Sequence, residues 1–87
     1  MAAVHLPGTL TPLFPGLSRH LDVDAASVGG VIEHLNAQWP GLGDRLCEPG
    51  PALRQHIHVY VDGERASLET PLEGRSRVDV IAAISGG

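Results

Sequence analysis

The residues of this chain best suited to chemistry are the last two, Gly86 and Gly87. They follow an apolar run, residues 78–84, that is typical of a strand. Glycine has no Cβ, so the walls of a partner's active site can close tightly around its backbone. The terminal carboxylate is a poor electrophile, but an acyl-adenylate made from it carries a good leaving group. A sulfur nucleophile would then give a thiocarboxylate, and an amine would give an amide.

The residues just before this end are compatible with such a role. The segment from Ile84 to Gly87 spans at most about 13 Å when fully extended, which is enough to enter a narrow slot in another protein. We therefore interpret Ile84, Ser85 and Gly86 as a tail that threads into a partner, with Gly87 as the reacting residue. The alternative is a frayed, solvated end, since terminal residues are often poorly ordered.

Length and composition indicate one small domain. The chain has 87 residues, of which 43% are apolar, and we assign residues 1–87 to a single domain with a flexible C-terminal tail at 84–87. The net charge is −4, and no basic patch is visible, which argues against a nucleic-acid partner. All six basic residues are arginine, so the chain has no lysine for a Schiff base or for lysine-linked chains of itself.

Cys47 is the single cysteine, which excludes an internal disulfide and a cysteine-based metal cluster. A lone thiol suits a reducing compartment. The N-terminal residues do not resemble a signal peptide, and no apolar run approaches the length of a membrane span. We therefore expect a cytoplasmic protein.

Periodicity predicts strands and one helix. Residues 2–6 and 17–23 alternate and are expected to form a hairpin, with His5, His20 and Asp22 on the outer faces. Ser27 is a candidate helix cap. Five apolar residues at helical spacing follow it and predict a core-facing helix that ends before Pro40: Val28, Val31, Ile32, Leu35 and Trp39. Gly29 and Gly30 inside this helix suggest a close approach of its backbone to the sheet.

The second half predicts three more strands. Residues 54–62 alternate clearly, Asp62-Gly63 is a strong hairpin-turn signal, and residues 64–67 would return. Residues 77–83 form the last strand. Residues 42–53 show no clean period, although Leu42, Leu46 and Leu53 could fix them to the core.

This order predicts an α+β fold of the β-grasp, or ubiquitin-like, type. A mixed sheet of 4–5 strands would carry one main helix on one face, since a hairpin, a crossover helix and further strands pack in this way.

Several short motifs carry a resemblance to a known family. They are Leu6-Pro7-Gly8-Thr9-Leu10, Trp39-Pro40-Gly41-Leu42, Val59-Tyr60-Val61-Asp62-Gly63-Glu64, and Val78-Asp79-Val80-Ile81 leading to Gly86-Gly87. With them the chain resembles, over its full length, the MoaD/ThiS family of sulfur-carrier proteins, and within it the CysO-type carriers.

The resemblance implies a carrier that is a co-substrate and not an enzyme. A ubiquitin-activating-type enzyme would adenylate Gly87 with ATP and Mg²⁺, and a sulfur donor would convert the adenylate to a thiocarboxylate. The sulfur would pass to a biosynthetic enzyme, with cysteine or a secondary metabolite favoured and molybdopterin or thiamin possible. ATP and Mg²⁺ belong to the partner, and no cofactor is expected on this chain.

Histidine, tyrosine and cysteine side chains elsewhere in the chain are further candidates for chemistry or binding. His56, His58 and Tyr60 are predicted on one strand face, as a surface that docks the activating enzyme. A metal site at the two histidines lacks a third ligand, so none is predicted; His34, like His5 and His20, is interpreted as scattered and solvated. Cys47 is interpreted as a structural thiol and not a nucleophile.

Two other functions use the same fold. A protein modifier would join its terminus to target lysines through an amide bond, and a plain interaction module would have an inert tail.

Overall fold

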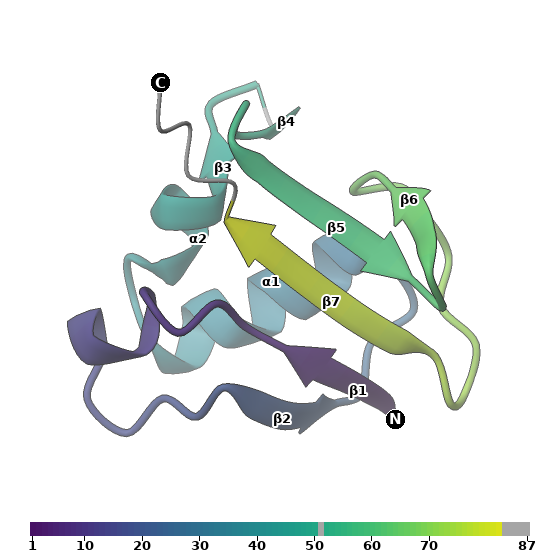
Figure 1. Cartoon of the computed structure of the whole chain (residues 1–87), viewed down its shortest axis with the longest axis horizontal. Coiled ribbons are helices and arrows are strands. Elements are labelled where there is room, and N and C mark those ends of the chain that lie inside the picture. Colours follow the sequence, from purple (N-terminus) through teal and green to yellow (C-terminus); the bar gives the residue numbers. More distant parts are fainter. Residues whose placement is uncertain (51, 83–87) are drawn as a thin grey trace.

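The computed structural model describes residues 1–50 and 52–82. These residues form a five-stranded mixed sheet with one helix lying across one of its faces (Figure 1). The strand order is β2-β1-β7-β5-β6, and β1 pairs with β7 in parallel while the other neighbours are antiparallel. The strands of this sheet are β1 (Ala2–His5), β2 (His20–Val23), β5 (Ile57–Val61), β6 (Glu64–Ala66) and β7 (Arg77–Ala82). The predicted α+β, β-grasp architecture is confirmed.

Helix α1 (Val28–Gln38) covers the inner face of the sheet. It begins as predicted, because the Ser27 hydroxyl accepts a hydrogen bond from the Gly30 N–H at 3.1 Å. Four residues of its apolar stripe are buried: Val28, Val31, Ile32 and Leu35. Trp39 ends the helix half-buried, and its indole N–H donates to the Pro15 carbonyl at 3.1 Å, which ties the preceding loop to the helix end.

The prediction that Gly29 and Gly30 bring the helix backbone close to the sheet is wrong. Gly29 approaches the loop before β7 and not the sheet: its N–H donates to the Leu68 carbonyl at 2.8 Å. A Cβ added at Gly29 would lie 3.2 Å from that same oxygen, so only glycine fits without a shift. The helix start is thereby fixed to residues 67–72, where Leu72 N–H also donates to the Ala26 carbonyl at 2.8 Å.

Residues 42–50 and 52–53 have more regular secondary structure than their sequence indicates. They form α2 (Leu42–Leu46) and a small antiparallel pair, β3 (Cys47–Glu48) with β4 (Ala52–Leu53). The Asn36 amide oxygen accepts from the N–H groups of Gly41 and Gly43, at 3.2 and 2.9 Å, and so satisfies backbone donors at the start of α2. Leu42 and Leu46 are fully buried, as predicted, and Leu53 packs against the core.

Two predicted strands are shorter in the structure. Residues 17–19 lie outside β2, although the hairpin of β1 and β2 forms as predicted. Residues 54–56 lie outside β5. Asp62 and Gly63 turn the chain from β5 into β6 with φ of 51° and 87°, the left-handed values that a tight hairpin turn requires. The 3-10 helix η1 (Thr11–Leu13) lies in the connection between β1 and β2.

The hydrophobic core lies between the sheet and α1. Its sheet residues include Val4, Ile57, Val59, Val78 and Val80, which alternate along their strands with outward-facing neighbours. Burying each such aliphatic side chain contributes on the order of 1.5–3 kcal/mol.

The hairpin turn gives a test of backbone strain. Gly63 and Gly74 both have open space where a Cβ would stand, but only Gly63 has a positive φ. We expect Gly63→Ala to lower the free energy of unfolding by about 1–2 kcal/mol because of that conformation. The matched control, Gly74→Ala, should leave stability unchanged or raise it by about 0.4–1 kcal/mol. Urea denaturation followed by circular dichroism measures both, and equal effects would contradict the assigned turn.

Candidate functional site

Strand β7 positions the segment that the sequence singled out. It lies between β1 and β5, with Val78 and Val80 buried against α1. Its last pairing joins Ala82 to Ile57. Residues 83–87, which include the predicted tail and Gly87, lie outside the described residues. The described chain therefore ends on a strand whose last three residues, 80–82, pair with β5.

Hydrogen bonds at residues 76 and 77 also hold the start of β7 in place. Ser76 is buried, and its hydroxyl accepts from the Glu73 N–H at 2.9 Å while its carbonyl accepts from the Ala3 N–H at 2.9 Å. The Asp62 carboxylate accepts from the Arg77 N–H at 2.9 Å. These contacts set the register of β7.

The sheet face opposite α1, here called the open face, carries the outward side chains of three central strands: His5, His58, Tyr60, Arg77, Asp79 and Ile81. A groove of about 590 Å³ crosses this face and reaches the last residues of β7, including Ile81 and Ala82. Ile81 is 47% exposed, an unusual exposure for a large aliphatic side chain in a central strand. Single exposed apolar side chains are normal on protein surfaces, so the interest of Ile81 lies in its place on the lining of this groove.

Two of the three predicted docking residues share this face. His58 and Tyr60 are half-buried on β5, where they pair in register with Ile81 and Asp79. The predicted placement of His56 with them is wrong. His56 is exposed in the turn before β5, and it lines a separate pocket with Asp44, Arg45 and Arg54. The alternation of residues 54–62 begins before the strand does, because β5 starts only at Ile57.

His58 carries an unusual feature. Its Nδ1 atom is buried and has no hydrogen-bond partner among the described residues. Such an atom is normally satisfied by protein or water.

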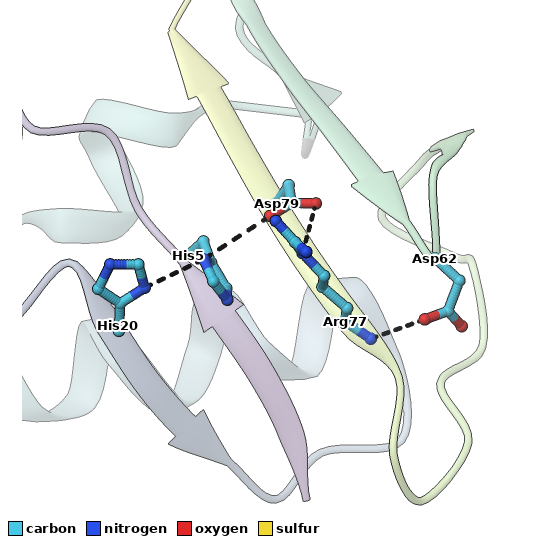
Figure 2. Close-up of polar contacts among 5 residues, drawn as sticks. All are labelled: His5, His20, Asp62, Arg77 and Asp79. Atoms are coloured by element: carbon cyan, nitrogen blue, oxygen red, sulfur yellow. Dashed lines mark hydrogen bonds and ion pairs between the residues drawn. The ribbon is translucent and has the colours of Figure 1, made fainter.

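The open face also holds a polar network that the sequence analysis missed (Figure 2). His20 contacts His5, His5 lies near Asp79, and the Arg77 guanidinium bonds the Asp79 carboxylate at 3.1 Å. The interpretation of His5 and His20 as scattered is therefore wrong. Both were expected on outer faces of one hairpin, so the missing information was the register that places them opposite each other.

Cys47 is half-buried at the end of α2. Burial raises the pKa of its thiol, and the nearby Arg54 guanidinium lowers it only in part. The thiol is thus kept protonated at neutral pH, which fits the predicted structural role.

Neither a membrane span nor a metal cluster is found within residues 1–50 and 52–82. No helix there is long and apolar enough to cross a membrane. No group of three or more His, Cys, Asp or Glu side chains there could hold a metal ion.

A mixed sheet in this strand order, with one helix on its inner face, defines a β-grasp domain. A model of the ThiS family matches residues 4–87, and the chain belongs to this family.

Similar proteins cover almost the same length. The sulfur carrier protein CysO of Mycobacterium tuberculosis is 27% identical over 97% of this chain and 96% of its own. Small archaeal modifier protein 3 of Haloferax volcanii is 32% identical over 74% of this chain and 73% of its own. A chain in the crystal structure of the Amycolatopsis orientalis BexX/CysO complex shares the fold, with a TM-score of 0.86, 23% identity and full coverage of both chains.

Cys47 reactivity tests the thiol environment. We expect the folded protein to react more slowly with a chromogenic disulfide reagent at neutral pH than the same protein in denaturant, because the folded thiol has the raised pKa. The rate should increase as the pH is raised through the alkaline range. Equal rates for folded and unfolded protein would contradict this assignment.

Proposed function

We propose that this protein is a sulfur carrier and that the carboxylate of Gly87 is its reacting group. The observation that carries the proposal is the family match, which covers residues 4–87 and so includes Gly86 and Gly87. The similarity to a sulfur carrier protein over 97% of the chain supports the same role.

The chemistry has two steps. A Gly87 carboxylate oxygen attacks the α-phosphorus of ATP, so that an acyl-adenylate forms and pyrophosphate leaves. A sulfur nucleophile then attacks the acyl carbon, AMP leaves, and the product is a thiocarboxylate. Ile84, Ser85 and Gly86 thread into the partner's active site, and the missing side chain of Gly86 limits the steric bulk next to the reacting carbon.

In this role the protein is a co-substrate for partner enzymes and not a catalyst. A ubiquitin-activating-type enzyme binds ATP and Mg²⁺, and a biosynthetic enzyme takes the sulfur. Cysteine or a sulfur-containing secondary metabolite is the favoured product, ahead of molybdopterin and thiamin, because of the similarity to CysO proteins. The need for ATP and the single thiol both suit the cytoplasm.

The open face is proposed as the docking surface for the activating enzyme. Tyr60 offers a rigid ring with a polar tip, Ile81 offers exposed apolar area, and the half-buried His58 lies opposite Ile81 in the sheet register. These three side chains lie on β5 and β7, and β7 directly precedes the proposed tail in the sequence. A partner that covers them would receive the tail beside its own contact surface.

Removal of Gly86 and Gly87 tests the carrier role. The full chain, incubated with its activating enzyme, ATP, Mg²⁺ and a sulfide source, should gain the mass difference between sulfur and oxygen at its C-terminus. The truncated protein should keep its fold by circular dichroism and gain no sulfur. Sulfur that appears elsewhere on the chain, or on the truncated protein, would refute the proposal.

A matched pair of substitutions tests the docking surface. Ile81 and Leu13 are similarly exposed, at 47% and 50%, but Leu13 lies on η1 and does not line the groove. We expect Ile81→Ala to raise the KM for the carrier in adenylation by about 5- to 30-fold, as removal of a central contact residue does. Leu13→Ala should leave KM unchanged. A similar effect of both would place the contact elsewhere.

A modifier role is the second candidate, favoured by the 32% identity to a small archaeal modifier protein. In that case the amine of a target lysine attacks the acyl carbon of the Gly87 adenylate, an amide bond forms, and AMP leaves. Higher-mass conjugates in cells, lost on deletion of Gly86 and Gly87, would support it. Because this chain has no lysine, such conjugates would not include lysine-linked chains of the protein itself.

A further inference from the structure

The register of the first hairpin places two histidines directly opposite each other on neighbouring strands. His5 on β1 pairs directly with His20 on β2. The Leu6 N–H donates to the Arg19 carbonyl at 2.7 Å, so the adjacent pair is a hydrogen-bonded one. His5 and His20 therefore form a non-hydrogen-bonded pair, the type in which cross-strand side chains come closest.

The two imidazole rings meet through the same nitrogen. The Nδ1 atoms are 3.0 Å apart, and the rings pack edge to face with centroids 4.4 Å apart (Figure 2). In the neutral pair one Nδ1–H donates to the other Nδ1. His20 is exposed and the side chain of His5 is 33% exposed, so an ion from solvent can reach this point.

This spacing suits two ligands of one metal ion. Imidazole nitrogens bind divalent ions at about 2.0–2.1 Å, so two nitrogens 3.0 Å apart subtend an angle of about 91–97° at the ion. That is the angle between neighbouring ligands in the square-planar or tetragonal geometry of Cu²⁺. Among the first-row divalent ions, copper also binds nitrogen ligands most tightly. We propose that His5 and His20 together form a two-histidine binding site for a divalent copper ion.

The surroundings also favour a cation at this point. The Asp79 carboxylate lies 4.0 Å from His5 Nδ1, outside the ligand set but close enough for its charge to stabilise the ion. Arg77 bonds this carboxylate at 3.1 Å, which holds it in place and partly offsets its charge. Since no cluster of three or more protein ligands exists in the described part of the chain, water completes the coordination.

The ion would replace the shared proton of the pair. Both Nδ1 atoms must present lone pairs to the metal, so the donating ring moves its proton to Nε2. Bound in this way, the ion links β1 to β2 on the open face, independently of the chemistry proposed for Gly87.

Titration calorimetry with copper(II) sulfate tests the site. The protein is the full chain without a polyhistidine tag, compared with His5→Asn, His20→Asn and the control His34→Asn. His34 is also exposed, but it lies on α1 beside Gln38. We expect one equivalent of copper to bind the wild type and His34→Asn equally, and either hairpin variant to bind at least about tenfold more weakly, since the second ligand acts at high effective concentration.

Two further measurements make the outcome decisive. Electron paramagnetic resonance of the copper complex should show two equivalent nitrogen ligands in a tetragonal site, and one in each hairpin variant. At the same copper concentration, the melting temperature of the wild type should rise more than that of His20→Asn. Full affinity in His20→Asn would refute the proposal, because the ion would then bind the N-terminal amine or His5 alone. Zinc binding tighter than copper would refute the assigned ion, and loss of folding in a variant would be visible in its circular dichroism spectrum.

Discussion

The structure depends on the burial of strand β7 in the middle of the sheet. β7 is the one strand that joins the hairpin of β1 and β2 to the hairpin of β5 and β6. It pairs in parallel with the first and antiparallel with the second, and Val78 and Val80 fill the core beneath it. Without these contacts the two hairpins would have no common sheet and α1 would have no continuous face to cover. In the sequence, the segment proposed to react follows the strand on which the fold relies.

The two faces of that sheet have separate tasks. The inner face is aliphatic and closed by α1, so it supplies stability. The open face carries histidines, a tyrosine, an Arg–Asp pair and the exposed Ile81. Substitutions on the open face can therefore alter recognition with little effect on the core. This division lets a small fold, with little stability to spare, keep a chemically varied surface.

Most of the fold was accessible from the sequence because its signals are local. Ser27 and the apolar stripe that follows it predict α1, and the Asp62-Gly63 pair predicts the hairpin of β5 and β6. The predictions were wrong or incomplete where contacts between residues distant in sequence determine the local structure. Asn36 organises α2 from a distance, and the carbonyl of Leu68 determines what can stand at position 29.

The candidate site was predicted less completely for the same reason. Alternation placed His58 and Tyr60 on one face, but the length of β5 could not be read from it, and His56 was included wrongly. The contact of His5 with His20 depends on register, which a hairpin with a long connection does not reveal from sequence. The tail itself, residues 84–87, was identified from composition and position, and its role stays a proposal.

The central place of β7 has a consequence for biosynthesis. During translation, β7 is made after both hairpins: Arg77 follows the end of β2 by 54 residues and the end of β6 by 11, and until then each hairpin has an unpaired inner edge. The ribosome adds roughly 5–20 residues per second, so the β1–β2 edge waits roughly 3–11 seconds for this neighbour and the β5–β6 edge roughly 0.5–2 seconds. Nascent chains would be exposed to mispairing or chaperone capture in that interval. An activating enzyme that reads the open face would also ignore immature chains, because that face does not exist until β7 has been inserted.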